Sequence, residues 1–562
     1  MQQSLCFLTS FKAGKDRSEG LTKSVFLWQL NLPVTVLRSM HIKTLLPLCL
    51  GLAFVVNLSA QFELPSPPEN WFNLDESSDG IAGIGTDKAY QEILKGKTSK
   101  PVVVAVLDSG VDIDHEDLDG NVWVNIGEIP GNGVDDDGNG YIDDIHGWNF
   151  LGSATEDVVY DNLEFTRIYR VLLMRFDGKT ADSVGDEDKD DFKRYELMKG
   201  QFEKRVADAE AEADDFYLIC EFYEMAKKNI AEVAGVSVDS LNRDHVINYS
   251  PESDFDEALK ELALAGFDDN LEADLEEGKR HYDSLLQYSY NLTFNSRDII
   301  GDDYDNLDER DYGNNRVEGE RAGHGTHVAG IIGAKRDNGT GINGISSHVE
   351  IMAVRVVPDG DEHDKDVANA IFYAVDNGAR IINMSFGKSY SPQKSQVDKA
   401  MKYAESKGVL LIHAAGNSNR SNDNSPNFPN PRPEMGEDCS TWIEVGASGP
   451  SADQDFVADF SNFGKKTVDI FAPGVRINST IPNNEYQIND GTSMAAPMVS
   501  GAAALVFSYY PELTGQELKA ILIESGTDRR KLKVNTPGSG KKAKFKKLCV
   551  SGVQLNVYNA LV

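Results

Sequence analysis

Cysteine is scarce in this sequence, which has five cysteines in 562 residues. Cys6 and Cys49 lie in the N-terminal leader described below, so Cys220, Cys439 and Cys549 remain in the body of the chain. Three widely spaced cysteines exclude a disulfide framework, although one pair could still form. Their spacing does not match a metal site, and none lies in a setting that favours a nucleophile.

Basic residues are also few, with 55 lysines and arginines against 90 aspartates and glutamates. The resulting net charge is −35. Nucleic acid and anionic membrane surfaces would repel such a chain, so we expect neither as a partner. The length of the chain predicts more than one domain.

The N-terminal region lacks an apolar stretch of the usual length of a transmembrane helix. The apolar stretch at residues 44–60 is shorter than the roughly 20 residues that a transmembrane helix needs. It follows Met40 and a short basic start and ends in small residues, which is the pattern of a secretory signal peptide. We interpret residues 1–60 as a leader with a signal peptide at about 40–60, cleaved before Gln61; a retained membrane anchor is the alternative. The mature protein is then exported to a periplasm, the cell surface or the medium, without stable membrane insertion.

Small residues surround Ser493 in the stretch 491–497, and an apolar run without charges continues through residues 502–506. This pattern predicts a loop that turns into a buried helix. We expect Pro497 in the first turn, where helix N–H groups have no partner within the helix. These groups and the positive end of the helix dipole would lie beside Ser493 and stabilise an oxyanion. A buried helix that happens to carry a serine is the alternative.

Two further motifs carry chemistry. Residues 101–107 form a continuous apolar run that predicts a buried parallel strand, with Asp108 at its carboxyl end. His324 stands between two glycines at the start of a predicted helix that ends near Gly333. Taken alone, this histidine would be a core residue or would form a metal pair with His327.

The three motifs, DSG, HGTHVAG and GTSMAAP, occur in the order Asp, His, Ser. In this combination they resemble the subtilisin-like serine proteases. The resemblance implies that Ser493 is the nucleophile, that His324 is the general base and acid, and that Asp108 orients the imidazole.

Two more segments are similar to this family. The apolar run 410–413 leads into AAGN, and the resemblance implies that Asn417 donates its side-chain amide to the oxyanion. The run 381–384 leads into SFG, which resembles the edge that pairs with an extended peptide. The implied substrate-binding residues are Ser385, Phe386 and Gly387. Family members often have leucine in place of Phe386, so the shape of the first pocket stays open.

The resemblance implies an α/β, three-layer subtilisin-like fold with a central parallel sheet. Its N-terminal part covers residues 61–155 and its remainder covers 296–562. Between them, residues 156–295 read as an acidic helical insertion, because residues 151–300 contain 36 acidic and 17 basic residues. The insertion is either a solvated surface decoration or a lid or exosite that screens substrates by charge. The roughly forty residues between the leader and the Asp108 strand are too few for the usual folded propeptide.

An aspartate-rich stretch at 135–144 follows the pattern of a calcium loop, in which hard oxygen ligands alternate and a glycine occupies the sharp turn. The candidate ligands are Asp135, Asp137, Asn139, Asp143 and the carbonyl of Tyr141. His146 stands where a tight site would have a bidentate glutamate, so we expect weaker, structural calcium binding. A polar turn without metal is the alternative. The loop 337–340 is a second, weaker candidate.

These features predict a secreted serine endopeptidase that hydrolyses protein or peptide substrates through an acyl-enzyme. The alternative is a catalytically silent protein of the same fold that binds partners in a calcium-dependent way. The sequence indicates no oligomeric state.

Overall fold

The computed structural model describes residues 67–268 and 271–562. The expected leader and signal peptide lie outside these residues. Among the described residues, no helix is both long and apolar enough to cross a membrane. The described chain forms a small compact unit, Arg205–Asp283, and a main unit that contains the rest.

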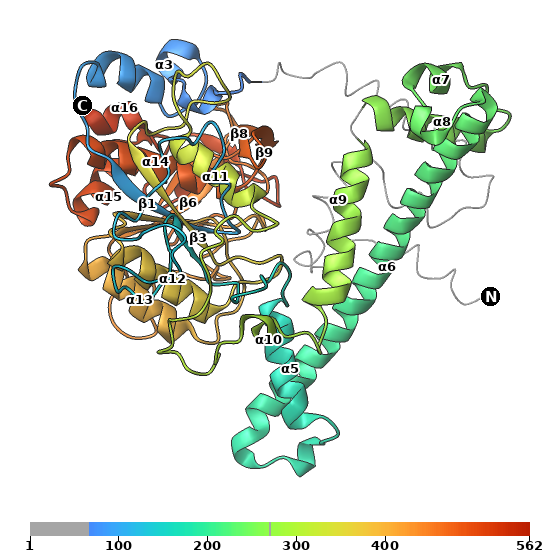
Figure 1. The fold of residues 1–562 in the computed structure, drawn as a ribbon, viewed down its shortest axis with the longest axis horizontal. Helices are drawn as coiled ribbons and strands as arrows, with labels where there is room; N and C mark the ends of the chain where they lie inside the picture. Colours follow the sequence, from blue (N-terminus) through green and yellow to red (C-terminus); the bar gives the residue numbers. More distant parts are fainter. Residues whose placement is uncertain (1–66, 269–270) are drawn as a thin grey trace. The chain divides into compact units, whose positions relative to one another are not determined.

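A nine-stranded sheet is the centre of the main unit (Figure 1). Its strand order is β10-β13-β7-β6-β5-β4-β1-β3-β2, and neighbouring strands are parallel except for the β10–β13 pair at one edge. The strands are β1 Val102–Asp108, β2 Gly147–Asn149, β3 Val349–Arg355, β4 Ile381–Met384, β5 Leu410–Ala414, β6 Trp442–Ser448, β7 Ile470–Pro473, β10 Thr527–Asp528 and β13 Val553–Gln554.

Strand β1 lies between β3 and β4, as a continuous apolar run requires. Val104 pairs with Ile351 on one side and with Ile381 on the other. Its side chain and that of Val106 enter the core on one face of the sheet, whereas Leu107 enters the core on the opposite face. Because both faces are covered, the strand can be apolar along its whole length.

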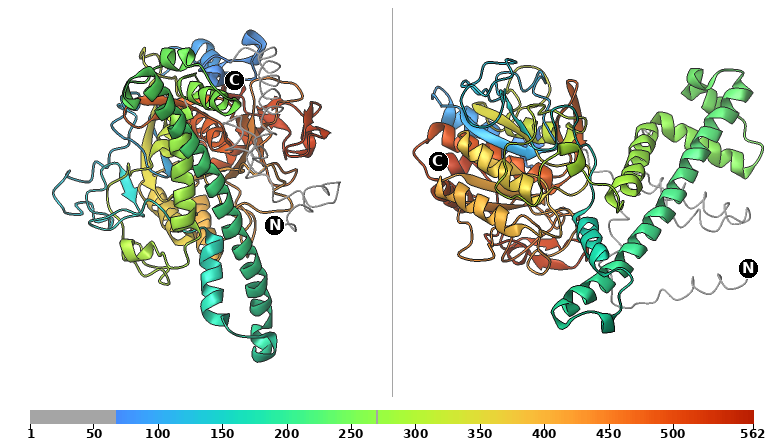
Figure 2. Two further views of the ribbon diagram at one scale, coloured as in Figure 1. Left: turned by 90° about the vertical axis from the view of Figure 1, so that its right-hand side faces the viewer. Right: turned by 60° about the horizontal axis from the view of Figure 1, so that its bottom comes forward.

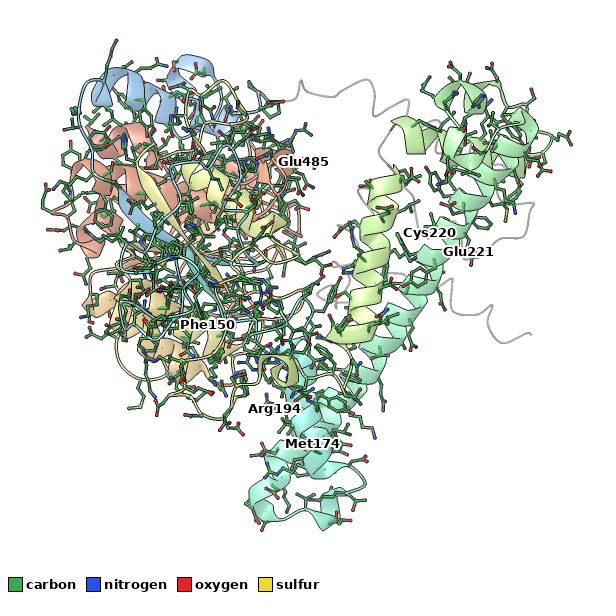
Figure 3. All side chains as sticks on the ribbon, in the orientation of Figure 1. Phe150, Met174, Arg194, Cys220, Glu221 and Glu485 are labelled. Carbon is green, nitrogen blue, oxygen red and sulfur yellow. The ribbon has the colours of Figure 1, made fainter. Side chains whose placement is uncertain are left out.

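Helices cover both faces of the sheet (Figures 1 and 2). On one face lie α12 Asp364–Asp376 and α13 Lys394–Ser406. The hydrophobic core between these helices and the sheet includes Phe150 (Figure 3). On the other face lie α11 Gly323–Gly333 and α14 Thr492–Tyr509. The two helical layers with the sheet between them confirm the predicted three-layer α/β fold.

Shorter elements complete the main unit. The helices are α3 Glu76–Asp79, α4 Thr86–Ala89, α10 Arg297–Ile300, α15 Gly515–Glu524 and α16 Val557–Leu561. The two-stranded sheets are β8 Ile477–Ile481 with β9 Glu485–Asn489, and β11 Lys533–Asn535 with β12 Lys542–Lys544.

The expected insertion is helical. Its helices are α5 Glu164–Phe176, α6 Lys189–Ala234, α7 Arg243–Asn248, α8 Asp254–Asp268 and α9 Leu271–Ser284. In the main unit, α5 packs on the start of α6, where Phe176 meets Phe192 and Tyr169 meets Phe202. The small unit has its own small core, formed by Ala226, Ile230, Val246, Leu259 and Ala263.

Cysteine pairing, which the sequence left open, does not occur among the described residues. Cys220 on α6 (Figure 3), Cys439 and Cys549 all carry free thiols. Cys439 and Cys549 are buried, and desolvation raises the pKa of Cys549 to about 11. Buried thiols of this kind are unreactive.

Candidate active site

Asp108 is the last residue of β1 and is almost completely buried. Its Oδ1 atom accepts the N–H of Ser109 at 2.8 Å and lies 2.7 Å from Nδ1 of His324. Because a carboxylate can only accept, Nδ1 carries the proton of the neutral ring, and Nε2 is left as an acceptor. The fold therefore joins two side chains that are 216 positions apart in the sequence.

The contact depends on glycine next to His324. A Cβ atom at Gly325 would lie 2.1 Å from the carbonyl oxygen of Gly110 and 3.1 Å from Cβ of Asp108. Only glycine lets α11 approach the end of β1 this closely. The His324 side chain is 40% exposed, so its free nitrogen can be reached from solvent. Desolvation opposes a charge on the ring, but Asp108 outweighs it and raises the pKa of His324.

His327, the second histidine of this motif, has a different role. It is completely buried, and its Nε2 donates to the carbonyls of Ile477 at 3.1 Å and Gln487 at 3.0 Å. Desolvation lowers the pKa of His327 to about 4, so the ring is neutral. It anchors α11 to the β8–β9 ribbon, an arrangement that leaves Nε2 unavailable for a metal pair with His324.

Ser493 is the second residue of α14, where the helix N–H groups have no partner within the helix. Pro497 is the sixth residue of this helix, so the expectation that it lies in the first turn was wrong. Proline has no N–H to donate to the carbonyl of Ser493, four residues earlier. The hydroxyl of Ser385 donates to that carbonyl instead, at 2.9 Å.

The Ser493 hydroxyl donates to the carbonyl of Ser385 at 3.1 Å. Among the described residues, no hydrogen bond joins Ser493 to His324. Catalytic hydrogen bonds are often long or misaligned in the absence of substrate.

Asn417 follows β5 and is oriented by α14. Its Oδ1 accepts the N–H of Thr492 at 2.9 Å and the hydroxyl of Thr492 at 2.8 Å. The amide Nδ2 is therefore turned the other way. The position that a Cβ atom of Gly491 would occupy lies 3.4 Å from Asn417 Nδ2 and 3.5 Å from the backbone nitrogen of Ser493. Both nitrogens therefore lie near the same point next to Ser493.

Residues 385–387, called the substrate edge below, follow β4 directly. Ser385 is oriented by Asn383 Nδ2, which donates to its hydroxyl at 3.0 Å, and Asn383 is in turn held by Ser500 of α14. The ring of Phe386 is half-buried. Within the described ranges, neither the N–H nor the C=O of Gly387 has a hydrogen-bond partner. The edge therefore has free backbone groups.

The acidic loop is arranged differently from the expected ligand set. The Asp135 carboxylate accepts the N–H groups of Gly138, Asn139 and Gly140, so it holds the turn. The Asp143 carboxylate likewise accepts three backbone N–H groups from residues 131–133. Both carboxylates thus stabilise loop backbone in this structure, as does Glu128, which accepts the N–H groups of residues 136, 137 and 143.

Glu128, Asp137 and Asp144 do converge, with carboxylate oxygens within 4.8 Å of one another. The Asn139 amide donates to Asp144 at 3.1 Å, beside them. Desolvation raises the pKa of Asp144 to about 6, and the charge of Asp137 adds to this shift. Three hard oxygen donors that repel one another fit a calcium ion. Sequence reasoning missed Glu128, which lies outside the motif, and Asp144, which its position beside Asp143 could have indicated.

The second candidate loop, at 337–340, is held by a single carboxylate. Asp117 accepts the amide of Asn338 at 2.7 Å and the N–H of Ile342 at 3.0 Å. Among the residues described, no group of three acidic, histidine or cysteine side chains converges at this loop.

A buried carboxylate in contact with an imidazole, and a serine near the start of a helix, are the residue types that an Asp-His-Ser hydrolase uses. Residues 99–540, most of the chain, match the model of the subtilase family. The chain belongs to this family, as its motifs predicted.

Named relatives agree with this assignment. The chain is 38% identical over 212 residues to a thermophilic serine proteinase of Bacillus sp. (strain AK1), covering 38% of this chain and 46% of the relative. It is 37% identical over 210 residues to subtilisin DY of Bacillus licheniformis, covering 37% and 71%. It is 39% identical over 188 residues to thermitase of Thermoactinomyces vulgaris, covering 33% and 61%. The match thus spans less than two thirds of the proteinase and of thermitase.

Proposed function

We propose that this protein is an exported serine endopeptidase that cleaves peptide bonds through an acyl-enzyme. The observation that carries the proposal is the 2.7 Å contact between Asp108 and His324; it is supported by the hydrogen bond from Thr492, the residue before Ser493, to Asn417. Family membership supports the same chemistry.

In the proposed reaction, the Ser493 hydroxyl turns from the Ser385 carbonyl towards Nε2 of His324 and attacks the peptide carbonyl. His324 takes the hydroxyl proton, and Asp108 stabilises the resulting imidazolium. The amide of Asn417 and the backbone N–H of Ser493 hold the oxyanion. His324 then protonates the leaving amine, and water hydrolyses the acyl-enzyme.

The substrate would bind as an extended peptide along the substrate edge. Leu107 pairs with Met384 at the end of β1, so the next residues of the edge lie beyond the point where β1 ends. The free N–H and C=O of Gly387 can therefore pair with a peptide that takes the place of the missing strand.

Calcium would bind at Glu128, Asp137 and Asp144, with the side-chain amide of Asn139 beside them. The ion would neutralise the repulsion between these carboxylates and so stabilise the loop before β2. Asp135, Asp143 and the carbonyl of Tyr141 remain the ligands that the motif predicts. Calcium titration of the variants Glu128→Gln and Asp135→Asn would show which ligand set holds the metal, because only loss of a true ligand should weaken calcium binding.

Labelling of the full chain with a fluorophosphonate tests the activity. We expect labelling of the wild type, none of Ser493→Ala, and weak labelling of His324→Ala. If folded wild type with calcium stays unlabelled, the catalytically silent binding protein becomes the better account.

A further inference from the structure

The insertion begins with a segment, residues 157–163, that is hydrogen-bonded to the loop following β3. The N–H of Asp161 donates to the carbonyl of Asp359 at 2.9 Å, and the N–H of Asp359 donates to the carbonyl of Val159 at 2.8 Å. At Gly360, a Cβ atom would lie 2.4 Å from the carbonyl oxygen of Asp161. Backbone hydrogen bonds therefore join the start of the insertion to the rest of the main unit, in addition to the chain connections at its two ends.

The first turn of α5 extends this contact with charged side chains. The Asp361 carboxylate accepts the N–H of Glu164 at 2.7 Å. The buried guanidinium of Arg167 donates to the carbonyls of Asp361 at 2.9 Å and Glu362 at 3.1 Å. It also donates to the Glu164 carboxylate at 2.7 Å, which fixes that carboxylate in place.

Lys388, the residue directly after the substrate edge, connects the edge to α5. Its side chain is 1% exposed, and its Nζ donates to Glu164 at 2.8 Å and to the carbonyl of Glu362 at 2.6 Å. The carboxylate of Asp364 lies 2.9 Å away. The backbone of Lys388 pairs with Phe428, so both its main chain and its side chain are held.

Both members of the Lys388–Glu164 pair are charged although they are buried. Desolvation opposes each charge, but their mutual attraction outweighs it, so the pKa of Lys388 is raised and that of Glu164 is lowered to about 2. Burial raises the pKa of the neighbouring Glu362 carboxyl. The carboxylate oxygens that contact Lys388 Nζ belong to Glu164, at 2.8 Å, and Asp364, at 2.9 Å.

We propose that the root of the insertion, residues 157–167, positions the substrate edge, and that Glu164 is the positioning residue. By holding Lys388, Glu164 fixes the far end of the edge, so a peptide that pairs along it meets a rigid backbone. The inference rests on the proposed peptidase activity. It assigns the insertion a role in binding extended peptides and none in activating Ser493.

The test compares two reactions of the full chain with calcium. One is hydrolysis of an internally quenched octapeptide, which can pair along the edge; the other is labelling by a small fluorophosphonate, which reports Ser493 alone. For Glu164→Gln we expect KM for the octapeptide to rise about tenfold or more, with labelling rate and kcat within about twofold of wild type. Arg175→Gln is the control, because this exposed residue of α5 pairs only within the insertion, and it should change neither reaction.

Glu164→Gln leaves Lys388 partly uncompensated and could prevent folding. The double variant Glu164→Gln, Lys388→Met removes both charges of the pair. Arg167 keeps Asp161 at 3.6 Å, and Asp364 keeps its hydrogen bonds from Ser391 and Gln393, so the variant should fold with the same rise in KM. An unchanged KM in either folded variant would overturn the proposal, as would an equal fall in hydrolysis and labelling. Wild type that is not labelled at all would instead refute the proposed function, and this inference with it.

Discussion

Once calcium has been removed, acidification should increase the stability that Asp144 contributes, whereas His327, whose pKa is lowered to about 4, acts in the opposite direction over the same pH range. Desolvation raises the pKa of Asp144 from 3.8 to about 6 in the folded chain, although the hydroxyl of Tyr373 and two amides donate to it. Between these two pH values Asp144 is more protonated in the folded state than in the unfolded state, so its contribution to stability falls as pH rises. The shift of roughly two pKa units corresponds to about 3 kcal/mol at most, since water near the loop screens part of it.

Calcium should reverse this behaviour. The ion needs ionised carboxylates, so its binding displaces the proton of Asp144 and becomes tighter as pH rises to about 6. Above that pH, calcium offsets the repulsion between Asp144 and Asp137. The stabilisation by calcium should therefore be largest at neutral pH and weak near pH 4.5.

Calorimetric melting with chelator and with calcium, from pH 4.5 to 7.5, measures both effects. Asp144→Asn is the matched variant, because it keeps the shape of the side chain and cannot ionise. Without metal above pH 6 it should melt higher than wild type, by about 3 °C at most, and it should gain less from calcium. If wild type and variant show the same pH dependence in chelator, Asp144 is not the group responsible and the reasoning is refuted.

Three predictions concern the reaction. Asn417→Ala should lower kcat by about 100-fold to 1000-fold, the loss measured for such a donor in this family, with KM little changed; a loss below tenfold in steady-state assays would contradict the oxyanion role. Asp108→Asn should lower kcat about 10,000-fold, as in other Asp-His-Ser enzymes, because the asparagine amide would hold the His324 ring in the wrong tautomer. Normal labelling rates would argue against this. Because Asp108 raises the pKa of His324, and the neutral ring is the active form, kcat/KM should rise with pH through a midpoint above 6.5. A midpoint below 6.5 in the pH profile would contradict the contact.

The sequence was sufficient for elements whose pattern is local. The apolar run before Asp108 and the small-residue helices around His324 and Ser493 each signal burial on both sides, and the structure places all three as expected. The structure confirms that AAGN ends a buried strand, and the oxyanion role of Asn417, which the resemblance implied, stays a prediction. In each case the residues that reveal the element are adjacent in the chain.

The sequence did not reveal residue pairs that only tertiary contacts bring together. Glu164 and Lys388 are 224 positions apart, and no local pattern marks either as a partner of the other. Glu128 joins the acidic cluster only because the chain folds back before the aspartate-rich loop. The position of Pro497 was misjudged because the start of a helix depends on where the preceding loop ends, which composition does not fix.

The substrate edge is held at two ends by different parts of the molecule. At the near end, Ser385 and Ser493 exchange two hydrogen bonds, one of which exists because Pro497 leaves the carbonyl of Ser493 free. At the far end, Lys388 is bound to Glu164 of the insertion. Loss of the far attachment leaves α14 and its contact with Ser385 in place. In the proposed peptidase, we therefore expect peptide affinity and the reactivity of Ser493 to change independently, because separate contacts support them.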